Sequence, residues 1–106
     1  MSRIFYDYLI SLEKIEIEIK KTVELPEERE ELWQIVDEIL HHRIISVILD
    51  KLPQEHHLEF LENFHSAPHA ESHINYLSER VVEDIEELIK KEAEKLTNEI
   101  IEEVLV

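Results

Sequence analysis

Apolar residues recur along most of this chain at spacings of three and four positions, the period of an amphipathic helix. Residues Ile15 to Ile19 also alternate with Glu, as a strand would. That alternation is short, lies inside the longer helical pattern and has no turn residue beside it. We therefore predict a helix over residues 3–22, whose apolar stripe is Phe5, Tyr8, Leu12, Ile15 and Ile19.

Two Leu-Pro sequences, ending at Pro26 and Pro53, indicate helix starts. Proline is tolerated at the first helical position, and the acidic side chains that follow favour the positive end of the helix dipole. The first start predicts a helix over residues 26–50, with an apolar face of Leu32, Trp33, Val36, Ile39, Leu40, Ile44 and Val47. The second predicts a shorter helix that uses Leu58, Phe60, Leu61 and Phe64. This helix ends near Pro68, because the residue before a proline disfavours the helical conformation.

Two more helices complete the pattern. A short one over residues 68–78 has Ile74 and Leu77 as its apolar pair, and the last segment has the most regular spacing in the chain. It predicts one continuous helix with the stripe Val82, Ile85, Ile89, Ala93, Leu96, Ile100 and Val104. The predicted fold class is therefore all-α: a helical bundle of three long and two short helices, in a single domain over residues 1–106.

Composition agrees with a helical fold and restricts the chemistry. Apolar residues make up 43% of the chain, enough for one core, and glycine, which hairpins and sharp turns need, is absent. Phosphate-binding loops and Gly-x-Ser-x-Gly elbows are excluded without glycine, and thiolate chemistry and disulfides without cysteine. We expect a non-enzymatic protein without cofactors.

The net charge of −15, from 26 acidic and 11 basic side chains, affects the choice of partner. Nucleic acid and anionic membranes would repel such a surface, whereas basic proteins or other copies of the chain remain possible partners. No apolar stretch exceeds three residues, and the start of the chain lacks the features of a signal peptide. We therefore expect a cytoplasmic protein.

Part of the sequence resembles a known group of proteins. The run Leu52-Pro53-Gln54-Glu55, the pair Phe60-Leu61 and the segment from Asp84 to Glu92 resemble small acidic helical proteins of unknown function from bacteria with reduced genomes. The resemblance covers roughly the C-terminal half. It implies a helical fold and no activity, and it assigns no functional residue.

Histidines are the main candidates for metal chemistry. Five of the seven lie close together in the sequence beside Glu55, Glu59, Glu62 and Glu71: His56, His57, His65, His69 and His73. Such a cluster could bind a divalent metal or respond to pH. The pairs Glu38/His41 and Glu62/His65 have the Glu-x-x-His spacing of di-iron bundles.

Two observations weigh against a metal site. Glutamate is so frequent that two such pairs are expected by chance, and Glu38 and His41 lie on the far side of their helix from Val36, facing solvent. In the second pair Glu62 lies on the flank, and only His57 and His65 approach the core edge. A metal-binding helical protein therefore stays an alternative, and we predict no metal ligands.

Two further features concern packing. Arg43 lies within the apolar stripe of its helix and needs a carboxylate or carbonyl partner if it is buried. Several helices also carry a second apolar face, formed by Ile10, Ile17, Ile45, Leu49, Ile101 and Leu105. Either a central helix buries both of its faces, or these residues form an interface.

We favour the interface. The predicted function is a protein-protein interaction or assembly module that forms a homodimer, since two-fold symmetry is the commonest in oligomers. The alternatives are the metal-binding protein and, from the charge alone, an acidic nucleic-acid mimic that binds a basic protein.

Overall fold

The computed structural model describes the backbone of residues 4–105 and the side chains of residues 4–103. Within this range the chain forms helices and no strand, so the predicted all-α fold is confirmed. The α-helices are α1 (Glu13–Thr22), α2 (Pro26–Lys51), α3 (His57–Ser66), α4 (Ser72–Arg80) and α5 (Ile85–Ile100). Shorter 3-10 turns lie at Asp7–Leu9 and Gln54–His56, and a π-helical turn at Ile101–Leu105 continues α5.

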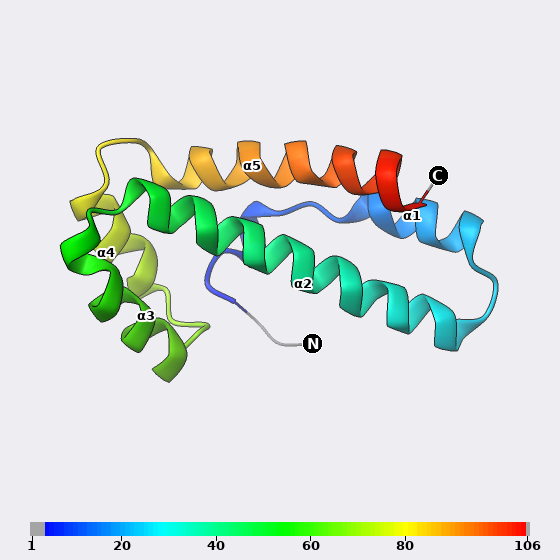
Figure 1. Cartoon of the computed structure of the whole chain (residues 1–106), viewed down its shortest axis with the longest axis horizontal. Helices are drawn as coiled ribbons and strands as arrows, with labels where there is room; N and C mark the ends of the chain where they lie inside the picture. The colour runs from blue at the N-terminus through cyan, green and yellow to red at the C-terminus, as the bar shows by residue number, and fades with distance from the viewer. Residues whose placement is uncertain (1–3, 106) are drawn as a thin grey trace.

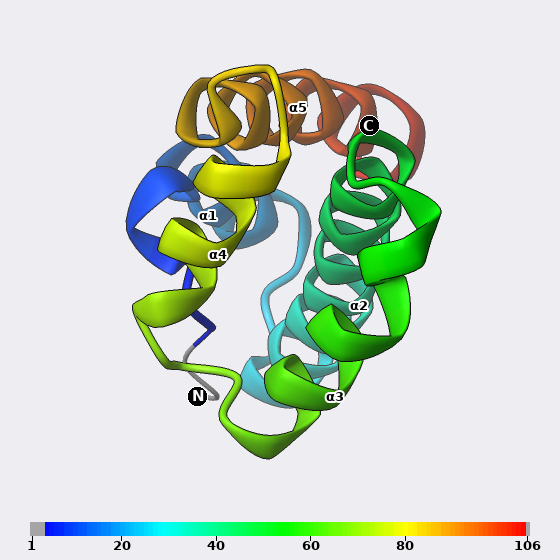
Figure 2. The same ribbon diagram turned by 90° about the vertical axis from the view of Figure 1, so that its left-hand side faces the viewer.

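Two long antiparallel helices, α2 and α5, form the frame of an elongated molecule (Figure 1) that measures 45 × 25 × 20 Å. α1 packs beside both at one end, and the short helices α3 and α4 lie across the other end (Figure 2). The local sequence explains the helix starts. Pro26 occupies the first turn of α2, and the Asp84 carboxylate accepts hydrogen bonds from the backbone N–H groups of Glu86 and Glu87 at the start of α5.

The apolar interior is divided into two cores, and α2 and α5 contribute to both. The first core joins the N-terminal segment to the second half of α2, α3, α4 and the first half of α5. The second core joins α1 to the first half of α2 and the end of α5, through Ile15, Ile19, Val36, Leu40, Leu96 and Ile100.

The prediction of one helix over residues 3–22 is wrong. α1 begins at Glu13, and the only helical element among the described residues before it, 4–12, is the turn at Asp7–Leu9. The adjacent residues Phe5 and Tyr6 are both buried in the first core. In an α-helix neighbouring side chains diverge by about 100°, so an irregular backbone lets both rings enter the same core. Tyr8, expected on the stripe, is exposed.

This change also corrects the helix inventory. The described part of the chain contains five α-helices, as predicted, but α1 has only 10 residues, so two of them are long and three are short instead of three long and two short. Leu58 and Val82, expected in the core, are exposed, and the fourth and fifth helices begin at Ser72 and Ile85, later than predicted. The side chain of Val104 lies outside the described part of the chain.

Candidate protein-interaction surface

The structure places most of the predicted interface residues against the cores of the chain itself. Ile10, Ile45 and Leu49 pack against the first core, and Ile101 packs against the second. Ile17 points away from both cores and is 52% exposed. The side chain of Leu105 lies outside the described residues. The five described residues therefore form no single face, because Ile10, Ile45 and Leu49 are partly buried against one core and Ile101 against the other, while Ile17 points outward.

A different apolar surface lies along the first half of α2. Leu25, at the helix cap, is 56% exposed, and Ile35 is 49% exposed. Leu32 lies between them in the sequence and Ile39 follows Ile35, and both of these residues are half-buried. Leu25, Leu32 and Ile39 follow each other at seven-residue intervals, and Ile35 is one helical turn from both of the last two. These four residues are called the α2 strip below.

Sequence reasoning missed this surface because it assigned Leu32 and Ile39 to the buried face of α2. A signal was present, since Leu25, Leu32 and Ile39 have the heptad spacing that is typical of a helix-pairing seam. The positions of α5 and α1 decide how deeply each of these residues is buried. The helical period of the sequence does not determine those positions.

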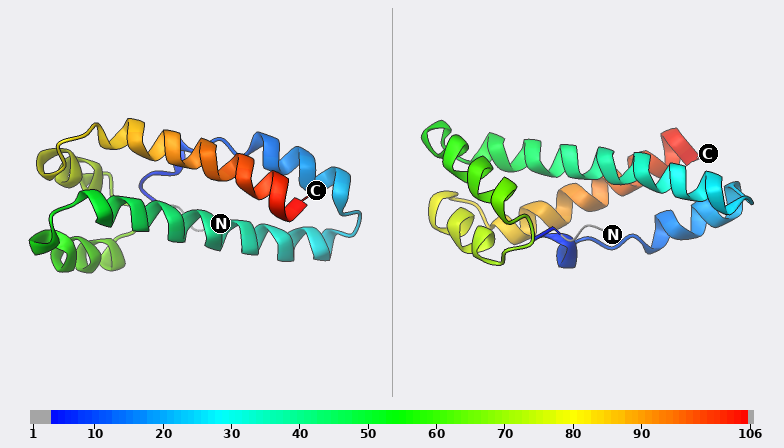
Figure 3. Two further views of the ribbon diagram at one scale, coloured as in Figure 1. Left: turned by 45° about the horizontal axis from the view of Figure 1, so that its top comes forward. Right: turned by 90° about the horizontal axis from the view of Figure 1, so that it is seen from below.

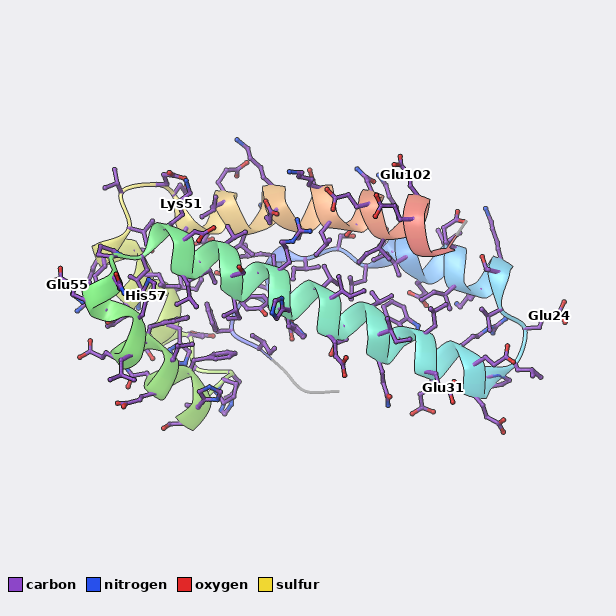
Figure 4. The ribbon with its side chains drawn as sticks, in the orientation of Figure 1. Glu24, Glu31, Lys51, Glu55, His57 and Glu102 are labelled. Carbon is purple, nitrogen blue, oxygen red and sulfur yellow. The ribbon has the colours of Figure 1, made fainter. Side chains whose placement is uncertain are left out.

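Charges around the α2 strip are unevenly distributed. Its N-terminal end is acidic: Glu28 and Glu31 are exposed, and Figure 4 shows Glu24 and Glu31 pointing away from the body of the molecule. At its other end His42 and Glu38 are both exposed. A partner helix that packs on the strip therefore meets fewer carboxylates at this end than at the N-terminal end.

Arg43 has the carboxylate partners that its position in the sequence requires. Its guanidinium nitrogens lie 3.3 Å from Glu92 Oε1 and 3.7 Å from Glu99 Oε2, so it links α2 to α5. Of the carboxylate and carbonyl partners that the sequence left open, the structure supplies carboxylates. Because the Arg43 side chain is 42% exposed, the pair lies at the edge of the helix contact and keeps part of its hydration.

The prediction that His41 faces solvent is wrong. Its Nδ1 lies 2.6 Å from the hydroxyl oxygen of Tyr6, and its Nε2 lies 3.0 Å from Asp37 Oδ1. A carboxylate only accepts hydrogen bonds, so in the neutral ring the proton sits on Nε2, and Nδ1 accepts from the Tyr6 hydroxyl. Glu38 is exposed and takes no part in this chain of bonds.

Tyr6 itself is fully buried. Burial raises its pKa well above the ordinary 10.0, because the phenolate would lose its hydration, and the negative charges of Asp7 and Asp37 raise it further. The hydroxyl therefore keeps its proton and acts as a hydrogen-bond donor to His41.

Two other histidines lie within hydrogen-bond distance of backbone carbonyl oxygens. Nε2 of His57 lies 2.7 Å from the carbonyl oxygen of Leu52, and Nε2 of the buried His73 lies 2.6 Å from that of Ala67. His65, expected at the core edge, is exposed. Among the described residues no three His, Asp or Glu side chains are placed to hold a metal ion.

A pocket of about 410 Å³ opens between the end of α3 and the start of α4. Two alanines, Ala67 and Ala70, share its lining with the polar side chains of Asn63, Ser66, Ser72, His73 and Tyr76. These side chains offer hydrogen bonds but no charge, so the pocket has no group that would fix a charged ligand.

Within the described residues, no helix combines the length and the apolar character needed to cross a membrane. Comparison of the chain with protein-family models, with curated proteins and with solved structures finds no match.

Proposed function

We propose that this chain is a protein-interaction module that associates with a second copy of itself through the α2 strip. The observation that carries the proposal is the exposure of Leu25 and Ile35, which share the α2 strip with the half-buried Leu32 and Ile39. Burial of such a line against another helix removes apolar surface from water and stabilises the complex.

A second copy suits the strip better than an unrelated helix. In a two-fold symmetric pair the same strip fills both sides of the contact, so a single surface is enough. An antiparallel arrangement places the acidic start of one α2 beside the less acidic end of the partner's strip, where His42 and Glu38 lie, and keeps the two acidic starts apart. A parallel arrangement would bring Glu28 and Glu31 close to their own copies.

The shape of the single chain supports association as well. Its radius of gyration is 15.0 Å, whereas a compact chain of this length measures about 13 Å. Its accessible surface is 7316 Å², whereas a compact monomer of this mass exposes roughly 6,200 Å². The excess is comparable to the surface that one partner buries in a stable dimer, about 800 Å².

Size-exclusion chromatography with light scattering, run in EDTA at pH 7.5, tests the proposal. We expect the wild type to have twice the 12.7 kDa mass of the chain, and Ile35→Glu to return it to a monomer. The matched control is Val82→Glu, which places the same charge on a fully exposed residue and leaves the dimer intact. Wild type that stays monomeric at high concentration would refute self-association.

A second substitution tests the choice of surface. Ile17→Glu changes the most exposed of the described residues first expected at the interface, on the outer face of α1. If Ile17→Glu abolishes the dimer and Ile35→Glu does not, the contact uses α1 and the assignment to the α2 strip is wrong.

A further inference from the structure

Two polar residues continue the heptad pattern of the α2 strip. Residues at seven-residue spacing form two rows on this side of the helix: Leu25, Leu32 and Ile39, and, three positions later, Glu28, Ile35 and His42. Such rows are the a and d pattern by which two helices pack together. At about 100° per residue, Glu28 falls within the arc of the strip, and His42 lies about 20° from Ile35. These two rows are called the α2 seam below.

Both polar side chains of the α2 seam are open to a partner. Glu28 and His42 are exposed, and within the described residues neither side chain forms an ion pair or a hydrogen bond. The left view of Figure 3 shows α2 along one edge of the molecule, with α5 and α1 on the side away from that edge. A helix that covers the α2 seam therefore meets a carboxylate near one end and an imidazole at the other.

Antiparallel pairing brings these two side chains together. Because the direction of the second helix is reversed, each row of one copy faces the other row of its partner. Both copies use the whole seam when the two-fold axis lies between the levels of Leu32 and Ile35. Glu28 then lies opposite the partner's Ile39, and the partner's His42 is three residues, about 4.5 Å, further along the helix axis.

The carboxylate of Glu28 needs such a partner once the seam is covered. Burial of a charged group between apolar side chains is costly unless a hydrogen bond or an opposite charge compensates it. The imidazole of His42 supplies a nitrogen-bound proton for this purpose. In a parallel pair Glu28 would instead lie beside its own copy, and the two like charges would repel each other.

We propose that Glu28 of one copy binds His42 of a second copy, and that the two symmetric pairs set the antiparallel orientation of the dimer. The proposal rests on the self-association through the α2 strip proposed above. A second copy is the occupant because the seam is complementary to itself when it is reversed: its carboxylate end meets its imidazole end.

A charge exchange between the two positions tests the pair. Sedimentation equilibrium of the full chain at pH 7.5 gives the dissociation constant of the dimer. We expect His42→Glu to raise this constant by about tenfold or more, because Glu28 then meets a second carboxylate. Addition of Glu28→Lys to the same chain should bring the constant back to within about threefold of the wild type, because the pair is rebuilt with its charges reversed.

The matched control is the double variant Glu30→Lys/His42→Glu. It has the same net charge as Glu28→Lys/His42→Glu, but Glu30 is an exposed residue about 160° around α2 from Glu28. Its dissociation constant should stay close to that of His42→Glu alone. If Glu30→Lys restores the dimer as well as Glu28→Lys does, net charge controls the association and the pair is wrong.

Crosslinking tests the orientation independently of charge. The protein has no cysteine, so an introduced thiol is unique. Copies with Glu28→Cys are mixed with copies with His42→Cys and treated with a short thiol-specific crosslinker. An antiparallel dimer should join the two different variants and leave each variant alone uncrosslinked. A parallel dimer would join Glu28→Cys to itself, and that product would overturn the proposal.

The outcomes separate the two proposals. A wild type that stays monomeric refutes self-association and the pair together. A dimer that Ile35→Glu disrupts, but that gives neither the restored dissociation constant nor the mixed crosslink, refutes the pair between Glu28 and His42 and leaves the α2 strip as the interface.

Discussion

The hydroxyl oxygen of Tyr6 lies 2.6 Å from Nδ1 of His41, across 35 positions of sequence. Because Asp37 holds the opposite nitrogen of the ring at 3.0 Å, the imidazole has a fixed orientation toward the phenol. One hydrogen bond thus ties the N-terminal segment to the middle of α2. It is also the polar contact of a side chain that is otherwise enclosed by apolar groups.

Removal of this hydrogen bond should lower stability. Tyr6→Phe keeps the ring but leaves Nδ1 of His41 without its donor, and we expect the free energy of unfolding to fall by about 1 kcal/mol. Urea unfolding followed by circular dichroism measures it. Tyr8→Phe is the control, because Tyr8 is 64% exposed and its hydroxyl is accessible to water. An equal loss in both variants would contradict the assignment.

The bond between Tyr6 and His41 should also be visible as energetic coupling. His41→Gln and Tyr6→Phe each remove the pairing, so the double variant should lose about 1 kcal/mol less than the sum of the single variants. Urea unfolding of the wild type, the two single variants and the double variant gives the four free energies that this comparison needs. Additive losses would mean that the two residues contribute independently.

Tyr6 should make the fold sensitive to alkaline pH. Its pKa is raised in the folded state, so above pH 10 the unfolded chain releases the phenolic proton while the folded chain retains it. The unfolded state then binds fewer protons, and stability falls as pH rises, by up to about 1.4 kcal/mol per pH unit for this group. Below pH 10 the protonated Tyr6 hydroxyl makes its full contribution to the stability of the fold.

Urea midpoints measured between pH 8 and 11.5 test this dependence. Tyr6→Phe cannot ionise, so its stability should fall less steeply with pH above 10 than that of the wild type. The remaining slope comes from other groups, including Tyr8 and Tyr76, whose pKa values are also raised. Parallel slopes in wild type and Tyr6→Phe would exclude Tyr6 as a source of the alkaline sensitivity.

The helices with strong local signals were predictable from sequence. The helix predicted over residues 26–50 matches α2 closely, because proline marks its start and an apolar stripe runs along its length. Most of α5 follows from the spacing of Ile85, Ile89 and Ile100. The segment before Glu13 was not predictable in this way, because the tertiary burial of Phe5 and Tyr6 together overrides the helical period there.

The surface was less predictable than the fold. A helix period says which residues share a face, but neighbouring helices decide which face stays open. Ile45 and Leu49 are partly buried against the first core, whereas Ile35 is 49% exposed. His73 and His41 are likewise placed by partners distant in sequence, the rings of Phe5 and Tyr6. Residue type alone carried no sign of these contacts.

The start of α5 should depend on Asp84. Its carboxylate accepts from the N–H groups of Glu86 and Glu87 at 3.1 and 3.3 Å, which otherwise have no partner within the helix. We expect Asp84→Ala to cost about 1 kcal/mol in thermal or urea unfolding, and Asp84→Asn, which keeps an acceptor oxygen, to cost clearly less. Equal losses would point to the charge of Asp84 instead of its hydrogen bonds.

Arg43 should contribute modestly and in a salt-dependent way. Its side chain is 42% exposed, and its two carboxylate partners lie at 3.3 and 3.7 Å, so water already screens part of the attraction. In a chain with net charge −15 it also separates two acidic groups that would repel each other. We expect Arg43→Met to lower the free energy of unfolding by about 1 kcal/mol at low salt.

Salt distinguishes this exposed ion pair from a buried one. At 1 M NaCl charges are screened beyond about 3 Å, so the loss in Arg43→Met should shrink toward zero. Arg43→Lys keeps the charge without the two-nitrogen fork and should fall between wild type and Arg43→Met at low salt. A loss of several kcal/mol that salt does not change would mean that Glu92, the less exposed partner, is left as an unpaired charge inside the contact between α2 and α5.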